Sequence, residues 1–193
     1  MSGYLLSFLL FVVGIVFGLL IFTVLMRLIL QIVRADFYNP ISQFMLRITN
    51  PMLLPLRRII PGLFGIDMAA VVLLVLLEAL EIVITHLLQG IGLHTPLLFL
   101  GELLGMIIQH TAQLFFISIM IMVVISWINP GARYNPIVQL VHQIAEPILR
   151  PARKILPPFN GIDLSPILAI IFLAAIMFLV AAPLIDLPHK IFY

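Results

Sequence analysis

The sequence predicts an all-α integral membrane protein with four transmembrane helices arranged in two parallel tandem repeats. Three observations support this fold class. Hydrophobic residues make up 63% of the 193 residues and charged residues only 9%, whereas a soluble domain carries roughly 25% charged residues. Four apolar segments are long enough to cross a bilayer, and the two halves of the chain resemble each other. Each half is expected to consist of a helix, a cytoplasmic amphipathic segment and a second helix.

The four apolar segments define the expected membrane spans. A bilayer core about 30 Å thick needs about 20 helical residues, and each segment meets that need. The expected spans cover residues 4–33, 68–88, 97–128 and 164–182. The first and third exceed the required length, so they should tilt or project beyond the bilayer. No basic residue precedes the first segment, so it reads as a retained helix rather than a signal peptide.

Basic residues are concentrated in the two connections that follow the first and third spans. In a four-span chain these two connections share one side of the membrane, and the positive-inside rule places that side in the cytoplasm. Both termini are then expected to face outward. The basic residues of the two connections are Arg34, Arg47, Arg57, Arg58, Arg133, Arg150, Arg153 and Lys154.

A shift of 96 residues superimposes the two halves of the sequence. Over residues 38–68, 15 of 31 positions are then identical without a gap. We therefore divide the chain into a first repeat, 1–96, and a second repeat, 97–193. Because each repeat holds two spans, the repeats should be parallel rather than inverted.

The repeated segments carry helix-boundary signals. Asn39 and Asn135, each followed by proline, are expected to be N-caps of short amphipathic helices. Asn50-Pro51 is expected to restart a second short helix, because proline interrupts a helix interior. Asp67 and Asp163 are expected to cap the next spans, where a carboxylate meets free amides and the positive end of the helix dipole.

The doubled motif resembles the YggT family of bacterial inner-membrane proteins. Its copies read NPISQFMLRITNPMLLPLRRIIPGLFGID and NPIVQLVHQIAEPILRPARKILPPFNGID, and the resemblance covers nearly the whole chain. It implies a bacterial inner-membrane location and a link to hyperosmotic stress tolerance and potassium uptake. Relatives called YlmG are linked to cell division and to nucleoid distribution in chloroplasts, and a plastid relative is linked to haem attachment in a b-type cytochrome. The resemblance supplies no catalytic residues.

What the resemblance does carry over is the motif itself. Its members in this chain are Asn39, Pro40, Pro51, Pro55, Arg57, Arg58, Pro61, Gly65 and Asp67, with Asn135, Pro136, Pro147, Pro151, Arg153, Lys154, Pro157, Gly161 and Asp163. The two copies differ where Asn50 faces Glu146 and where Gly62 faces Pro158.

Charged residues inside the spans are the candidate ion site. Glu78 and Glu81 lie on one helix face, with Glu78 near the middle of its span. A carboxylate at that depth costs about 2.5 kcal/mol or more on insertion scales, so a cation or proton site is one reading. A protonated or ion-paired structural group is the other. Arg27 could pair with Glu78, although extension toward the cytoplasmic headgroups is the favoured expectation.

The remaining intramembrane polar residues are given structural readings. Glu102 and His110, eight residues apart, are expected in or near the outer interface. The spacing of His86, His94 and His110 predicts no metal site. The basic clusters are expected to contact anionic lipid headgroups, with docking of a protein partner as the alternative.

Two functions of different class remain open. The first is a cation pathway, or an accessory to one, which with four helices would require a homo-oligomer. The second is a non-catalytic scaffold or assembly factor for division, respiratory or cofactor complexes. The sequence has no cysteine, nucleotide-binding loop or nucleophile–base pattern. We therefore expect no enzymatic activity, no cofactor, no metal and no nucleic-acid partner.

Overall fold

Helices make up nearly all of the described chain. A computed structural model describes residues 3–35, 38–63, 65–92, 95–129, 131, 135–158 and 163–192, with side chains described to residue 187. The helices are α1 (Gly3–Ile32), α2 (Pro40–Arg57), α3 (Met68–Gln89), α4 (Pro96–Ile128), α5 (Pro136–Ile155), α6 (Ser165–Ile176), the π-helix η2 (Met177–Ala181) and α7 (Ala182–Phe192). Within these residues no strand forms, and a single isolated bridge joins Leu63 to Ile66.

Four helical spans are long and apolar enough to cross a membrane. They are Gly3–Ile32, Met68–Gln89, Pro96–Ile128 and Ser165–Leu187. The all-α fold and the four spans are therefore confirmed, and the chain is a multi-pass membrane protein. The first three agree with the predicted bounds to within one residue at each end.

The fourth span is longer than predicted. The apolar segment was expected to end at Ala182, and the next residue, Pro183, has no N–H to donate. Instead the helix widens into η2, where the N–H of Ala182 bonds to the carbonyl of Met177, and it continues as α7. A π-helical turn shifts the hydrogen-bond register and so carries the helix past a proline.

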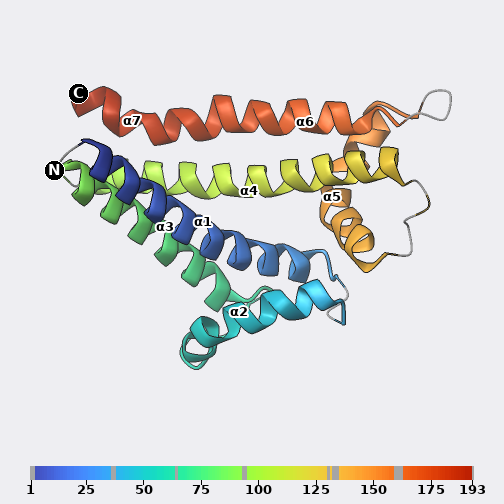
Figure 1. Cartoon of the computed structure of the whole chain (residues 1–193), viewed down its shortest axis with the longest axis horizontal. Coiled ribbons are helices and arrows are strands. Elements are labelled where there is room, and N and C mark those ends of the chain that lie inside the picture. The colour runs from blue at the N-terminus through green and yellow to red at the C-terminus, as the bar shows by residue number, and fades with distance from the viewer. Residues whose placement is uncertain are drawn as a thin grey trace.

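The two halves of the chain have the same order of elements (Figure 1). α1 packs against α3 in the first half, and α4 packs against α6, η2 and α7 in the second. Both termini lie at one end of the molecule, and α2 and α5 lie toward the other. The two basic segments therefore lie toward the same end of the molecule, and the cytoplasmic location of that end stays a prediction. The repeat boundary at residue 96 itself stays a prediction.

α2 and α5 are each one continuous helix, so the expected restart at Asn50-Pro51 is wrong. Pro51 and Pro55 lie inside α2 and are exposed. Each removes one backbone donor and frees the carbonyl four residues earlier. At an exposed face that carbonyl can bind water, so the helix continues past both prolines.

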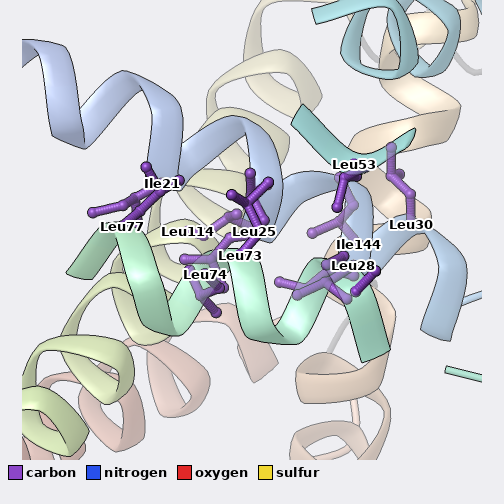
Figure 2. Packing of buried hydrophobic residues seen from close by; sticks show 14 of the residues in the cluster. Ile21, Leu25, Leu28, Leu30, Leu53, Leu73, Leu74, Leu77, Leu114 and Ile144 are labelled. Carbon is purple, nitrogen blue, oxygen red and sulfur yellow. The ribbon is translucent and has the colours of Figure 1, made fainter. Parts of the chain in front are cut away.

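Leucine and isoleucine side chains fill the space between α1 and α3 (Figure 2). Ile21, Leu25 and Leu28 of α1 lie against Leu73 and Leu77 of α3. Leu114 of α4 and Ile144 of α5 join the same cluster, so the two halves share one core. In lipid such packing stabilises through close contact rather than through exclusion of water.

The contact between α4 and α7 depends on a glycine. A Cβ at Gly105 would lie 2.8 Å from Ile185 Cγ1 and 3.0 Å from the carbonyl oxygen of Ala181. Gly101 lies one turn earlier, 4.0 Å from the carbonyl of Leu184 by the same construction. Small residues four apart let two membrane helices approach closely.

We predict that Gly105→Ala lowers stability, because the added methyl group overpacks a tight helix contact, at a cost of about 1–3 kcal/mol. Gly14→Ala is the matched control, since a Cβ at Gly14 meets nothing within 4 Å. Thermal unfolding in detergent, followed by circular dichroism, measures both. Equal melting temperatures for the two variants would refute the close approach at Gly105.

Candidate functional site

Glu78 is the most deeply placed charge in the described chain. It is the eleventh residue of the 22-residue α3, its side chain is 0% exposed, and its Oε1 lies 2.8 Å from Nδ1 of His110 on α4. The charged form of a carboxylate at this depth is costly without a partner. His110 supplies that partner, a contact that the structural reading of His110 in or near the outer interface did not include.

A second pair of the same chemistry joins the same two helices. His86 Nε2 of α3 lies 3.0 Å from Oε1 of Glu102 on α4, and both side chains are buried. The expected position of Glu102 in or near the outer interface stays a prediction, whereas its pairing with His86 was not anticipated. Glu102 lies nearer the end of the α3–α4 hairpin but is enclosed by protein.

The two pairs are crossed, with glutamate and histidine exchanged between the helices. Glu78 and His86 are eight residues apart on α3, and Glu102 and His110 are eight residues apart on α4. In an antiparallel hairpin this spacing places each glutamate opposite the histidine of the other helix. The two pairs are then about 12 Å apart along the helix axis. The twofold Glu-x7-His pattern is the sequence signal that could have identified both pairs.

Glu81 lies beside the Glu78–His110 pair, which is the pair farther from the connection between α3 and α4. It lies one turn from Glu78 and close enough to interact electrostatically with both Glu78 and His110. The Oε2 atoms of Glu78, Glu81 and Glu102 are buried without a hydrogen-bond partner in the described structure. We refer to Glu78, Glu81 and His110 as the inner cluster. Carboxylates and imidazoles are the groups that carry protons across membranes in relays.

A metal site is not formed by the described residues. They contain no group of three or more histidine, cysteine, aspartate or glutamate side chains able to hold a metal ion. His94 lies outside the described residues.

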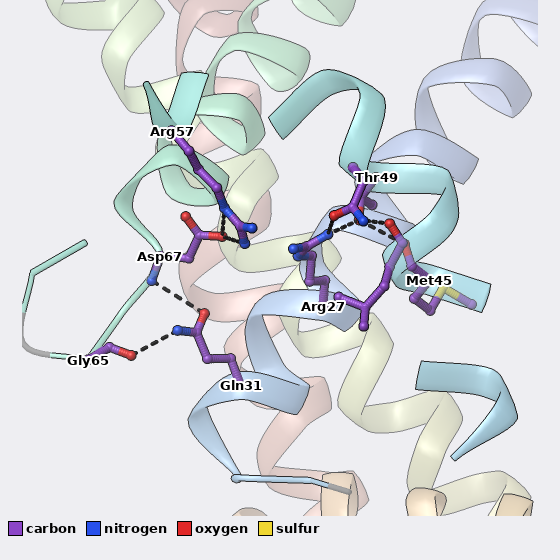
Figure 3. A network of polar contacts seen from close by, with 9 residues as sticks. Arg27, Gln31, Met45, Thr49, Arg57, Gly65 and Asp67 are labelled. Carbon is purple, nitrogen blue, oxygen red and sulfur yellow. Dashed lines mark hydrogen bonds and ion pairs between the residues drawn. The ribbon is translucent and has the colours of Figure 1, made fainter. Parts of the chain in front are cut away.

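Arg27 belongs to a different contact (Figure 3). It is 6% exposed, and its Nη1 donates to Oγ1 of Thr49 and to Oδ1 of Asn50, 2.9 Å away. Arg27 thus reaches toward the basic end of the molecule, as favoured, but it meets α2 rather than lipid headgroups. The alternative pair with Glu78 is not formed, because His110 takes that position.

The repeated asparagines act as predicted. Asn39 accepts a hydrogen bond from the Ile41 N–H at 3.0 Å, and Asn135 accepts one from the Ile137 N–H at 2.9 Å. Each precedes a proline at the first helical position. The duplicated Asn-Pro elements therefore begin α2 and α5.

An arginine–aspartate pair closes each repeat. Arg57 binds the carboxylate of Asp67 (Figure 3), and Arg153 Nε donates to Asp163 at 3.0 Å. These pairs occupy equivalent positions, so each ties an amphipathic helix to the start of the following span. Asp67 is the N-cap residue of α3, as predicted, but its carboxylate is bound by Arg57 and makes no capping hydrogen bond. Asp163 does accept from the Ser165 N–H at 2.9 Å.

The Asp163 carboxyl is stabilised in its charged form. Burial would raise its pKa, but hydrogen bonds from Ser165 and Arg153 outweigh it and hold the pKa below the usual value. A group whose folded-state pKa is depressed stabilises the fold above its unfolded pKa. That contribution is lost only as the pH falls through the folded value.

The difference between Asn50 and Glu146 has a structural cause. Asn50 accepts from Arg27, whereas the second repeat has Val123 at the position equivalent to Arg27. Glu146 instead accepts from Nη1 of Arg153 at 2.9 Å. Asn50 and Glu146 thus each accept a hydrogen bond from an arginine of their own repeat, Arg27 and Arg153 respectively.

The other motif residues shape the chain around these contacts. Gly65 has φ 79° and accepts from Gln31 Nε2 at 2.9 Å, which holds the turn into α3 (Figure 3). Its equivalent, Gly161, lies outside the described residues.

Arg58 and Lys154 are exposed and are in none of the ion pairs of the described chain. The exposed prolines of the motif are Pro40, Pro51, Pro55, Pro61, Pro136, Pro147, Pro151 and Pro157.

α2 and α5 meet at their first turns. Asn39 Nδ2 donates to the carbonyl of Pro136 at 2.7 Å. A cavity of about 180 Å³ lies beside this contact, with Tyr38, Gln139 and Gln143 among its lining residues. The two halves are therefore joined near both ends, by the α3–α4 pairs and by this contact.

Comparison with known proteins places these features in a family. The family model described as CCB3/YggT matches residues 6–88 and again 101–184. The chain is 48% identical to an uncharacterized protein of Pseudomonas aeruginosa over 84% of this chain and 83% of that protein. It is 32% identical to the uncharacterized protein YggT of Escherichia coli K12 over 86% and 85% of the two chains.

A shorter relative matches about half of the chain. The uncharacterized protein ycf19 of Porphyra purpurea is 33% identical over 78 residues, which are 40% of this chain and 81% of that protein. No solved structure is significantly similar to the chain.

We predict that Glu78 and His110 are energetically coupled. In a double-mutant cycle with Glu78→Gln and His110→Gln, the coupling free energy should fall in the range of about 0.5–3 kcal/mol found for contacting residues. The control cycle pairs Glu78→Gln with His86→Gln, which lies two turns away and should be additive within about 0.5 kcal/mol. Unfolding in detergent measures both cycles, and additivity in the first would contradict the pair.

We also predict that the two neighbouring arginines of α2 differ in importance. Arg57→Gln leaves the buried Asp67 without its cation and should cost about 1–3 kcal/mol. Arg58→Gln should change stability by less than about 0.5 kcal/mol, because its side chain is exposed. The same unfolding assay compares them, and a larger loss at Arg58 would reverse the assignment.

Proposed function

Because the chain belongs to the CCB3/YggT family, we propose that it serves ion homeostasis in the bacterial inner membrane under osmotic stress. It does so as a cation pathway or as an accessory to one, without catalysing a reaction. The proposal rests on the buried site and on the resemblance of the doubled motif to the YggT family.

The observation that carries the proposal is the burial of Glu78 at mid-span. Its Oε1 is held by His110, and its Oε2 is buried without a hydrogen-bond partner in the described structure. An ionisable group at this depth is expensive and generally marks an ion or proton route. A purely structural contact would be made more cheaply by apolar residues, since a buried ion pair adds little net stability.

The depth of the inner cluster also suits a pathway. Glu78 lies about 15 Å from Met68 at the start of α3, roughly half of a 30 Å bilayer core. The His86–Glu102 pair provides a second polar station between the cluster and the hairpin end. Four spans per chain are few for a pore, so we include homo-oligomerisation in the proposal.

The proposed orientation follows the positive-inside rule. The end bearing α2 and α5 faces the cytoplasm and the termini face outward. Exposed Phe44 and Ile48 lie on α2 with exposed Arg58 at its end. Such an amphipathic helix can rest in the headgroup region and bind anionic lipid.

The second candidate is a scaffold or assembly factor. It is favoured by exposed Arg58, Arg150 and Lys154, which are in none of the ion pairs of the described chain. These side chains lie on α5 or at the end of α2, outside the spans, where a protein partner could reach them. Photo-crosslinking from positions 58 and 154 would identify such a partner.

Cation flux tests the first proposal against the second. Proteoliposomes holding the purified chain should show potassium uptake under a membrane potential, and both Glu78→Gln and Glu81→Gln should reduce it at least tenfold. Glu146→Gln is the matched control, because Glu146 is a half-exposed carboxylate of α5 outside the spans. No flux from folded wild-type protein would reject the pathway and favour the scaffold.

A further inference from the structure

One apolar face of α2 is exposed although the equivalent face of α5 is buried. Leu140 and Ile144 of α5 are 3% and 1% exposed. A shift of 96 residues takes them to Phe44 and Ile48 of α2, which are 57% and 36% exposed. All four side chains are large and apolar. The two repeats therefore differ in what covers this face, and not in its chemistry.

The first repeat supplies the cover of α5. Leu140 and Ile144 belong to the buried cluster that also holds Leu28 of α1, and Figure 2 shows Ile144 beside Leu28. Within its own repeat, α2 packs against α1 and α3 as α5 packs against α4 and α6. In the described residues, however, α2 has no contact with α4 as extensive as that of α5 with α1. The first repeat thus lacks one packing partner that the second repeat has.

The matching face lies on α4 and is also exposed. The α1 residues of the shared cluster are at most 7% exposed, whereas their equivalents on α4 are each at least 40% exposed. Apolar exposure to lipid is ordinary in a membrane span, but burial of the same repeat positions in α1 is not explained by lipid. Both sets recur at helical spacing and so form one stripe on each helix. The α1 residues are Ile21, Val24, Leu25 and Leu28, and the α4 residues are Ile117, Met120, Ile121 and Val124.

We propose that a second copy of this chain covers both faces, with α2 of each copy packed against α4 of the other. Ile48 then meets Val124 of the second copy, as Ile144 meets Leu28 within one chain. Each copy carries one α2 face and one α4 face, so a twofold axis covers all four and closes the assembly at two chains. Van der Waals packing stabilises such helix contacts in lipid. This inference rests on the homo-oligomer included in the proposed function and names the surface that forms it.

Crosslinking between two differently tagged copies tests this surface, because the chain contains no native cysteine. One copy carries Ile48→Cys and the other Val124→Cys, and the co-expressed copies are oxidised mildly in membranes. We expect a disulfide that joins the two tags, since it requires Cα atoms within about 7 Å. Phe172→Cys in place of Ile48→Cys is the matched control. Phe172 of α6 and its equivalent Leu76 are exposed in both repeats, so this combination should crosslink little.

Particle mass in mild detergent gives a second readout. Light scattering should find two chains per particle for the wild type and one for Ile48→Asp, because a carboxylate inside the packed face has no partner. Ile59→Asp is the control and should leave two chains, since Ile59 and its equivalent Ile155 are exposed in both repeats. Both changes lie at exposed positions, so each chain should keep its fold.

The outcomes separate this inference from the proposed function. No crosslink between Ile48→Cys and Val124→Cys in folded protein would overturn the surface and leave lipid headgroups as the cover of α2. Equal crosslinking by Phe172→Cys, or two chains per particle for Ile48→Asp, would overturn it as well. Potassium flux without this crosslink would keep the cation pathway and reject the surface. The crosslink without flux would keep the surface and reject the pathway.

Discussion

The cost of placing a carboxylate inside a bilayer is the constraint on which this structure depends. Glu78 and Glu102 are both buried within the spans, and each is bonded to a histidine of the opposite helix. Because the pairs are crossed, they can form together only when α3 and α4 hold one register. α3 ends the first half of the chain and α4 begins the second, so this register sets how the two halves meet.

Repeated and unrepeated residues have different roles in the molecule. The Asn–Pro caps and the Arg–Asp pairs occur in both halves and build the same unit twice. The polar residues of α3 are not repeated: a shift of 96 residues takes Glu78 to Ala174 and Glu81 to Met177, the first residue of η2. The span that follows α5 in the second repeat therefore forms without the carboxylates found in α3. Glu78 of α3 and Glu102 of α4 instead serve the junction of the two halves, where each is paired with a histidine of the other helix.

Composition and local signals predicted most of the fold. The spans were predicted closely because length and hydropathy alone decide whether a segment crosses a bilayer. The asparagine caps were predicted because a cap depends on residues adjacent in sequence. The failures came from contacts across sequence distance. Asp67 bonds to Arg57 instead of to its own helix, and the prolines of α2 lie on an exposed face that tolerates the lost hydrogen bonds.

The site was predicted only in part for the same reason. Burial cost identified Glu78 and Glu81 individually, whereas their partner depended on the register of α3 against α4. Ile82 and Met106 lie midway between the two crossed pairs, four residues from each along their helices. They should face each other if the register is correct.

Disulfide crosslinking tests this register most directly, because the chain contains no native cysteine. The account predicts that Ile82→Cys combined with Met106→Cys forms an intramolecular disulfide in membranes under mild oxidation. Val83→Cys with Met106→Cys, turned by about 100° around α3, should form little. Efficient crosslinking of the second combination in place of the first would contradict the crossed pairs.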